Sequence, residues 1–152
     1  MTTLVDVGRL PAEVMDSLEY VMFGAIGMTS VALAGAAAGS LTLSQWRALV
    51  VIGRADQMRV GAVAGAVGMS LPSTSRLMRR LEHAGLVSSV RDDSDRRATL
   101  ITLTPAGHRL RDVVVRRRRT LMEEALAASG ARVPKDLRGG LAAIARAFDP
   151  YA

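Results

Sequence analysis

Apolar residues recur at a helical spacing through the middle of the chain. Thr42 and Gln45 stand at the spacing of a capping box, in which each side chain bonds the other residue's backbone, so we expect a helix to begin near Leu43. The apolar positions that follow recur at i, i+3, i+4 and i+7 and are Trp46, Leu49, Val50 and Gly53. This spacing predicts one short helix, ending near Gly53, with a single buried stripe.

Two more short helices, with a tight turn between them, are predicted over residues 58–87. The apolar face of the first consists of Val60, Val63, Ala64 and Val67, and Gly68 ends this helix. Ser70 can cap the second helix, and Pro72 lies in its first turn. The apolar stripe of the second consists of Thr74, Leu77, Met78 and Leu81. The pattern therefore predicts a helix-turn-helix unit.

The opposite face of the second helix is basic. It carries Ser73, Arg76, Arg80 and His83, with Arg79 at its edge. Small hydroxyl side chains in its first turn let a backbone approach closely, and arginines can bind phosphates or base edges. This profile is typical of a recognition helix in the DNA major groove. The alternative is a solvated amphipathic helix whose arginines bind nothing.

A β-hairpin is predicted directly after this helix, which ends at Gly85. LVSSV at residues 86–90 reads as one strand, and ATLITLT at residues 98–104 alternates as its partner should, with Ile101 and Leu103 on one face. Between them, RDDSDRR carries six charges in seven positions. Such a loop cannot be buried, because unpaired charges inside a protein are costly. It projects into water or onto a charged partner, as the tip of a wing.

Long helices are expected on both sides of this region. Thr104 and Pro105 mark the start of one that we expect to run to about Ala128, and a last helix is expected from about Lys135 to Phe148. The four arginines at 116–119 turn about 100° per residue, so they surround the long helix instead of sharing a face. We expect them to be solvated or paired with acids, with contact to DNA phosphate as the alternative.

Residues 20–46 carry no charge. The length alone would permit a membrane span. However, Ala, Gly, Ser and Thr dominate the segment, and the acidic Asp16 and Glu19 precede it. We therefore expect a long buried helix, with a membrane span as the alternative.

Composition and charge narrow the class of function. At 152 residues, with 49% apolar and 3% aromatic residues, the chain suits one compact helical domain. The net charge of +6 arises in its middle, because residues 41–119 hold 15 basic against 6 acidic residues, which favours nucleic acid as a partner. There is no cysteine, and His83 and His108 have no ligand cluster around them. We expect no catalytic activity, no metal and no cofactor.

Three motifs in order, LTLSQWRAL, VGAVAGAVGMSLPSTSRLMRRLEHAGLV and RDDSDRRATLITLTPAG, cover roughly residues 41–107. Together they resemble the multiple antibiotic resistance regulator (MarR) family of bacterial winged helix-turn-helix repressors and activators. The resemblance implies that Asp95 and Arg97 form the family's D-x-R wing motif, in which the arginine enters the minor groove and the acid helps to hold it. The residues that we expect to contact DNA are Ser70, Pro72, Ser73, Ser75, Arg76, Arg79, Arg80, Asp95, Arg96 and Arg97.

The resemblance also implies an assembly and a signal. In the family, the first and last helices interlock into a homodimer, which places two recognition helices about one DNA turn apart. Ligands, often aromatic or phenolic, bind between the dimerisation helices and the DNA-binding lobe. Here we expect a binding site for a small aromatic or hydrophobic effector. Its lining residues should be Met22, Phe23, Ile26, Met28 and Trp46. The charge-free first helix departs from the family, whose first helix usually carries several basic residues.

We therefore expect a mainly α (α+β) fold in one domain over 1–152. Its winged-helix DNA-binding lobe should span 41–104 with a two-stranded β wing, and its dimerisation helices should lie in 10–40 and 105–152. The expected function is that of a cytoplasmic, ligand-responsive homodimeric repressor on a pseudo-palindromic operator in double-stranded DNA, with no membrane partner. The alternative is a membrane-associated or structural DNA-binding protein that senses no ligand.

Overall fold

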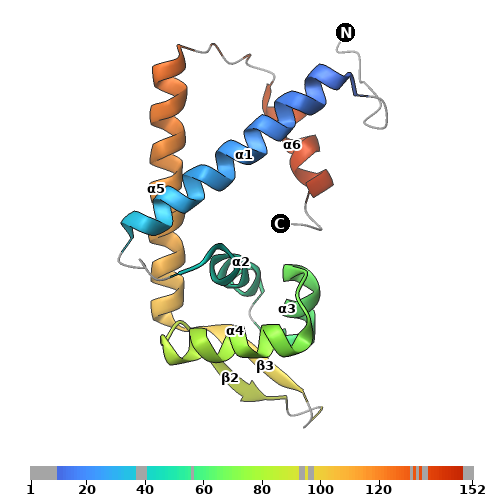
Figure 1. Ribbon diagram of the computed structural model, residues 1–152, viewed down its shortest axis with the longest axis vertical. Helices are drawn as coiled ribbons and strands as arrows, with labels where there is room; N and C mark the ends of the chain where they lie inside the picture. The colour runs from blue at the N-terminus through green and yellow to red at the C-terminus, as the bar shows by residue number, and fades with distance from the viewer. Residues whose placement is uncertain are drawn as a thin grey trace.

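The computed structural model describes residues 10–36, 41–55, 57–92, 95, 98–130, 132, 134 and 137–148. The elements follow in the order α1 (Ala12–Gly35), α2 (Leu43–Ile52), β1 (Met58–Arg59), α3 (Val60–Val67), α4 (Leu71–His83), β2 (Val87–Arg91), β3 (Thr99–Leu103), α5 (Pro105–Ser129) and α6 (Leu137–Phe148). A lobe of short helices and strands occupies one end of the molecule, and the long helices α1 and α5 extend from it (Figure 1). The expected mainly α winged-helix fold is confirmed.

The helices α2, α3 and α4 pack with the small sheet around the first hydrophobic cluster. Its buried members are Ala48, Leu49, Ile52, Val63, Leu77, Met78, Leu81, Val87, Ile101 and Leu103. The stripe predicted for α4 is confirmed, because Thr74, Leu77, Met78 and Leu81 are all buried. Of the stripe predicted for α2, Trp46 and Leu49 are buried, while Val50 and Gly53 are only partly buried. The helix also buries Ala48, Val51 and Ile52, so its buried surface is wider than one stripe. It is enclosed by α3 on one side and α5 on another.

The sheet has three antiparallel strands, in the order β1–β3–β2, where two were expected. The additional strand, β1, pairs Met58 with Ile101 of β3. Two residues are too short to show an alternating pattern, so this strand gave no signal in the sequence. The alternation predicted for β3 is confirmed, because Ile101 and Leu103 are buried while Leu100 and Thr102 are partly exposed.

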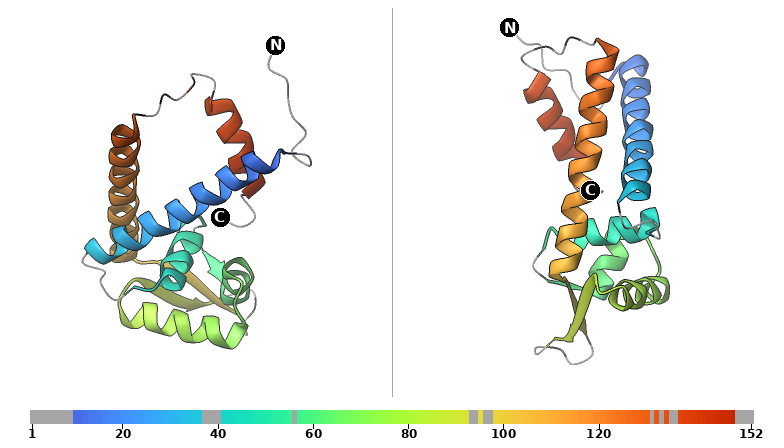
Figure 2. Two further views of the ribbon diagram at one scale, coloured as in Figure 1. Left: turned by 45° about the horizontal axis from the view of Figure 1, so that its top comes forward. Right: turned by 90° about the vertical axis from the view of Figure 1, so that its left-hand side faces the viewer.

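The second hydrophobic cluster joins the long helices to the lobe. It consists of Ala32, Leu33, Ala36, Trp46 and Val114, contributed by α1 with its C-terminal cap, α2 and α5. Leu41 and Leu110 pack against both clusters. The views in Figure 2 show the C-terminal part of α1 beside α5, above the lobe. Trp46 is 5% exposed and is therefore a central packing residue of this cluster.

The expectation of a buried first helix is wrong for the single chain. Helix α1 buries only Thr29, Ala32 and Leu33, whereas Tyr20 is 83% and Phe23 is 72% exposed. The reason is that α1 crosses α5 obliquely, so the lobe and α5 cover only its C-terminal part (Figure 1). By length and composition α1 is a helix that could cross a membrane, which is weak support for a span.

The local start and stop signals are confirmed. Thr42 and Gln45 form the capping box, Ser70 caps α4, and Thr104 caps α5 with Pro105 in its first turn. Gly68 and Gly85 both have a φ of 68°, the left-handed conformation that glycine adopts without strain. The last helix spans Leu137–Phe148, and Lys135, where we expected it to begin, lies outside the described residues.

Candidate nucleic-acid interface and neighbouring cavity

The helix α4 is held at its N-terminus by a chain of hydroxyl groups. The Ser70 Oγ accepts a hydrogen bond from the Ser73 backbone N–H at 3.4 Å and donates to the Ser73 Oγ at 3.0 Å. The Thr74 hydroxyl donates to the Ser70 carbonyl, and the Ser75 hydroxyl donates to the Leu71 carbonyl. Pro72 is exposed beside them. The first turn of α4 therefore presents a rigid, closely approachable backbone.

The outer face of α4 carries uncompensated positive charge. Arg76, Arg79 and Arg80 are all exposed. The Arg76 Nη2 donates to the Ser73 Oγ at 3.3 Å, and none of the three arginines forms an ion pair with any carboxylate that the structure describes. The one carboxylate of this helix, Glu82, accepts hydrogen bonds from the Ser89 backbone and hydroxyl instead. The arginines are thus available to an anionic partner.

The hairpin of β2 and β3 forms the wing. Its loop closes where the Asp92 N–H donates to the Ala98 carbonyl at 3.1 Å, and Asp95 lies in the turn between them. The Asp92 carboxylate is 11% exposed and pairs with the Arg59 guanidinium, which is 51% exposed. Of the predicted wing residues, Asp95 is exposed, and Arg96 and Arg97 lie outside the described residues. The base of the wing is therefore fixed to the start of α3.

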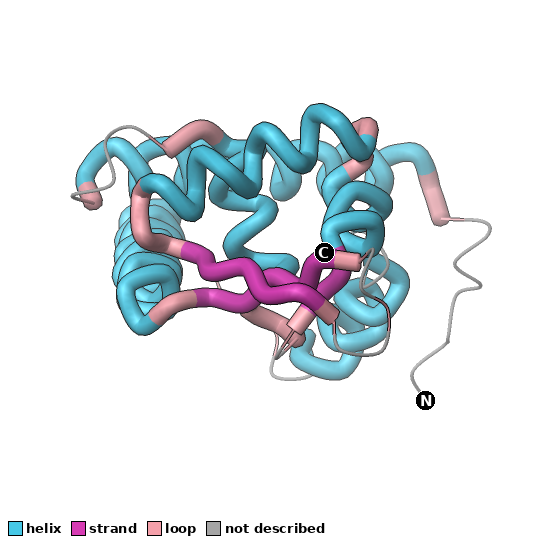
Figure 3. The backbone as a smooth tube through the Cα atoms, turned by 90° about the horizontal axis from the view of Figure 1, so that it is seen from below, coloured by secondary structure: helices cyan, strands magenta, loops and turns pink. Residues whose placement is uncertain are grey.

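Helix α4 and the wing share one end of the molecule. Figure 3 looks onto this end and shows α4 running beside the hairpin. Next to α4, a shallow groove of about 280 Å³ is lined by Ser44 and Gln45 at the N-terminus of α2 and by Ser73, Arg76 and Arg80 of α4. A helix N-terminus and two guanidiniums are a favourable environment for a phosphate group. Of the predicted α4 residues, Ser73, Arg76 and Arg80 thus line this groove, whereas Ser75 and Arg79 line another one between α4 and the wing.

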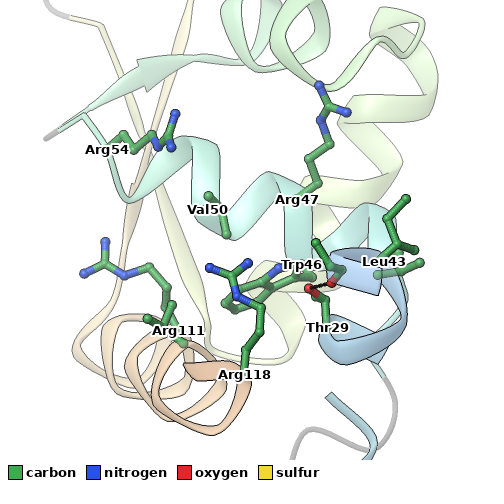
Figure 4. A pocket seen from close by; sticks show the side chains of 11 residues that line it. Thr29, Leu43, Trp46, Arg47, Val50, Arg54, Arg111 and Arg118 are labelled. Carbon is green, nitrogen blue, oxygen red and sulfur yellow. Dashed lines mark hydrogen bonds between the residues drawn. The ribbon is translucent and has the colours of Figure 1, made fainter. Parts of the chain in front are cut away.

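A cavity of about 660 Å³ lies on the other side of α2, between α1, α2 and α5 (Figure 4). Its lining residues are Ala25, Ile26, Thr29, Leu43, Trp46, Arg47, Val50, Arg54, Arg111, Val115 and Arg118. Ile26 and Trp46, both expected to line an effector site, do so. Met22, Phe23 and Met28 do not. Helix α1 lines the cavity through Ala25, Ile26 and Thr29 instead.

Four arginines line this cavity, and the sequence reasoning missed them. Arg111 donates from Nη1 to the Gly53 carbonyl at 2.7 Å and from Nη2 to the Asp112 carboxylate at 3.2 Å. Arg47 donates from Nη2 to the Ala66 carbonyl at 2.9 Å. Arg118 is half-buried and has no hydrogen-bond or ion-pair partner among the described residues. In Figure 4 the Arg111 and Arg118 side chains extend from α5, while the Arg47 side chain extends from α2 toward the helices of the helix-turn-helix.

The arginines at 116–119 differ in their environments, as a run that surrounds a helix should. Arg116 and Arg119 are exposed, and Arg118 lines the cavity. Arg117 donates from Nη1 to the Gly35 carbonyl at 3.0 Å, at the C-terminal end of α1. Its partner is thus a helix-terminal carbonyl, where water or an acid was expected. A cation at this position is favourable because the last carbonyls of a helix carry partial negative charge.

Within the described residues, no group of three or more His, Asp or Glu side chains lies close enough to hold a metal ion. The chemistry of both sites is that of arginine, hydroxyl and apolar side chains. Such groups bind anions and flat apolar molecules.

Comparisons with known proteins agree with this geometry. Residues 41–99 match the sequence model of the MarR family. The transcriptional activatory protein BadR of Rhodopseudomonas palustris is 35% identical over 80 residues, which cover 51% of this chain and 46% of BadR. The match thus spans slightly less than half of that relative's length.

Solved structures resemble the chain over most of its length. The transcriptional regulator Tm0710 from Thermotoga maritima gives a TM-score of 0.74 at 20% identity, covering 91% of this chain and 96% of the other. FabT of Streptococcus pneumoniae, solved in complex with DNA, gives 0.72 at 17% identity, covering 90% and 93%. At these identities the likeness establishes the fold.

Proposed function

Because this chain belongs to the MarR family of winged helix-turn-helix proteins, we propose that it regulates transcription by binding specific sites on duplex DNA. Members of the family are transcription regulators and not enzymes. Arg76, Arg79 and Arg80 carry this proposal, since they lie exposed on α4 without a described carboxylate partner. We assign α4 to the major groove and the wing, through Arg96 and Arg97, to the neighbouring minor groove, with Asp95 holding Arg97.

We propose that two chains form the DNA-binding unit. All but three of the large hydrophobic side chains exposed among the described residues lie on α1, α5 and α6. On α6 the exposed Leu137, Leu141 and Phe148 form one stripe with the half-buried Ile144, at i, i+4, i+11 and i+7 respectively. Apolar surface of this extent supports an interface. Helices α1 and α6 and the C-terminal part of α5 lie away from α4, so a dimer joined through them leaves both copies of α4 exposed (Figure 1).

DNA footprinting across the organism's own genome, combined with sedimentation, tests this proposal. We expect a dimer that protects pseudo-palindromic sites. We also expect binding to weaken steeply with salt, because each neutralised phosphate contributes about 0.9 to the log–log slope. Transcription of a footprinted promoter, with and without the protein, then distinguishes the proposed repression from activation. A monomer at micromolar concentration, or binding indifferent to salt, would contradict the proposal.

We further propose that the cavity takes an effector with an anionic group on an apolar, aromatic body. The apolar walls of the cavity consist of Ile26, Trp46, Val50 and Val115. The four arginines add positive charge, which a site for a neutral apolar ligand would not require. A volume of about 660 Å³ falls in the range of small-molecule sites. Carboxylates form their strongest hydrogen bonds with guanidinium groups. An aromatic carboxylate therefore fits this lining better than a neutral phenol does.

Fluorescence titration tests the effector site, because Trp46 is the single tryptophan of the chain and lies in the cavity wall. We expect benzoate to change its emission saturably and to alter operator affinity, and benzamide, which has the same shape without the charge, to bind more weakly. The Arg118→Met variant should lose this preference for benzoate. If neither compound perturbs fluorescence or DNA binding, the effector proposal fails and the DNA-binding proposal stands.

A membrane-associated protein is the second candidate, because α1 is long and apolar enough to span a bilayer. We favour a cytoplasmic protein, since α1 packs on α5 through Ala32 and Leu33 and since the family consists of soluble regulators. Fractionation of expressed protein distinguishes the two. Recovery with the membrane after a high-salt wash would support the span.

A further inference from the structure

Arg47 connects the cavity to the helix-turn-helix. Its side chain lines the cavity from α2, and its Nη2 donates to the Ala66 carbonyl at 2.9 Å, in the last turn of α3. Figure 4 shows this side chain leaving α2 in the direction of the lobe. The Ala66 carbonyl lies two residues before Gly68, whose left-handed turn leads to Ser70, the cap of α4. One side chain therefore spans from the cavity wall to the turn that sets the recognition helix.

The Ala66 carbonyl depends on Arg47 because the turn satisfies its neighbours instead. The Met69 N–H donates to the Ala64 carbonyl at 3.0 Å, and the Gly68 N–H donates to the Gly65 carbonyl at 3.3 Å. The last carbonyls of a helix have no partner within the helix and need one outside it. A guanidinium is also favoured there by the partial negative charge of the helix end. Arg47 thus closes the C-terminus of α3.

We infer that Arg47 is the positioning residue that transmits effector binding from the cavity to α4, an inference that rests on the effector site proposed above. A carboxylate bound among the cavity arginines competes with the Ala66 carbonyl for the Arg47 guanidinium. A hydrogen bond between two charged groups is roughly twice as strong as one with a neutral partner, so the competition favours the carboxylate. The hydrogen bond that joins the C-terminus of α3 to α2 is then broken, and the turn to α4 is less firmly held.

Arg111 lines the same cavity and also holds a helix-terminal carbonyl, but it does so from α5 and at the end of α2. It bonds both the Gly53 carbonyl and the Asp112 carboxylate, and its side chain is 26% exposed. Arg47 is exposed, and its bond to Ala66 is solvent-accessible. Arg47 therefore connects α2 to the turn before α4, whereas Arg111 fixes α2 to α5.

The test measures effector binding and operator binding separately in the full-length protein. Trp46 fluorescence reports benzoate binding, and fluorescence anisotropy reports affinity for a footprinted operator. In the wild type we expect saturating benzoate to lower operator affinity by about fivefold or more, within the usual range of allosteric coupling. In Arg47→Met, benzoate should still saturate the site, but operator affinity should already be lowered and should change less than about twofold on saturation.

Two variants separate coupling from folding and from binding. Arg47→Lys keeps a charged donor and should restore most of the response, so a fold defect of Arg47→Met cannot explain the loss. Arg118→Met removes a cavity arginine without a described contact to the lobe. It should weaken benzoate binding but keep the full response at saturation. Amide exchange at Gly68 and Met69 should rise with benzoate in the wild type and be high without it in Arg47→Met.

The outcomes distinguish this inference from the function on which it rests. A wild-type protein that does not bind benzoate, or that binds it without any change in operator affinity, overturns the proposed effector response, and the role of Arg47 falls with it. If the wild type responds and Arg47→Met responds equally at saturation, the effector site stands and only the role of Arg47 is overturned. Loss of response in Arg47→Met with rescue in Arg47→Lys supports the inference.

Discussion

The Arg59 guanidinium donates two hydrogen bonds to one oxygen of the Asp92 carboxylate, at 3.0 Å from Nε and 2.6 Å from Nη2. The two residues are 33 positions apart, and their pair fixes the base of the wing to the N-terminal cap of α3. Because Asp92 is nearly buried while Arg59 is half-exposed, the pair should stabilise the fold modestly, by about 1 kcal/mol.

A double-mutant cycle with Arg59→Met and Asp92→Asn tests this pair. Each single variant should unfold at lower urea concentration, and the double variant should lose less than the sum of the two, because the second substitution finds no partner to remove. Operator affinity should fall in both single variants, since the wing is then less firmly oriented. Strictly additive losses would show that the two side chains act independently.

The α4 arginines should contribute to DNA affinity more than arginines elsewhere. We expect Arg76→Ala to weaken specific binding by about 1–3 kcal/mol, because this side chain faces outward beside Ser73 and can reach a base edge or a phosphate. Arg119→Ala, at an arginine of α5 that is also exposed, serves as the matched control and should leave affinity nearly unchanged. Equal losses in both variants would mean that binding follows net charge instead of the α4 surface.

The wing should act through its arginine side chains as well. We expect Arg97→Ala to cost about 1–3 kcal/mol of operator affinity, and Asp95→Ala to reproduce part of that loss. Anisotropy on an operator and on a scrambled duplex measures both effects, with circular dichroism to confirm the fold. Unchanged affinity in a folded Arg97→Ala protein would refute the assignment of this residue to the minor groove.

Two leucines of α4 differ strongly in their burial. Leu81 is fully buried in the first cluster, so Leu81→Ala should destabilise the protein by about 2–5 kcal/mol through lost contacts and the cavity left behind. Leu71, in the same helix, is 54% exposed, and Leu71→Ala should cost far less. Urea unfolding monitored by Trp46 fluorescence gives both values. Similar losses would contradict the packing of α4 described above.

The start of α5 has no room for a Cβ atom at one glycine position. A Cβ on Gly107 would lie 2.1 Å from the Leu86 carbonyl oxygen, a backbone atom that cannot easily move. Gly107→Ala should therefore destabilise the protein by about 1–3 kcal/mol or displace α5. Gly65, a helical glycine in α3, has nothing within 4 Å of such a Cβ, so Gly65→Ala should stabilise by up to about 1 kcal/mol. Thermal unfolding of both variants decides the point.

The helices and strands were predictable where a few neighbouring residues determine the local structure. The start of α2 was predicted from Thr42 and Gln45, and the start of α4 from Ser70 and Pro72. The apolar stripe that ends at Leu81 repeats often enough to predict the buried face of α4. The alternation around Ile101 likewise predicted its strand. Each of these features depends on neighbours in sequence, and so the residues alone contain them.

The cavity was only partly predictable, because its lining depends on contacts between distant segments. Arg47 meets Ala66 across 19 positions, and Arg111 meets Gly53 across 58. No periodicity connects such pairs, so these arginines looked like ordinary solvated charges. For α1, apolar composition predicts burial but does not say in which chain the covering surface lies, and only the family resemblance indicated a second copy of the chain.

The length of α5 makes it a lever. Its 25 residues extend for about 37 Å from Pro105, at the winged lobe, to Ser129, near the surfaces proposed to hold the dimer together. A tilt of about 5° at the Ser129 end would displace the Pro105 end by about 3 Å. That displacement is close to the rise of about 3.4 Å between successive base pairs. Small angular adjustments among apolar helices are thus converted, by the rigidity of one helix, into a change of register along DNA.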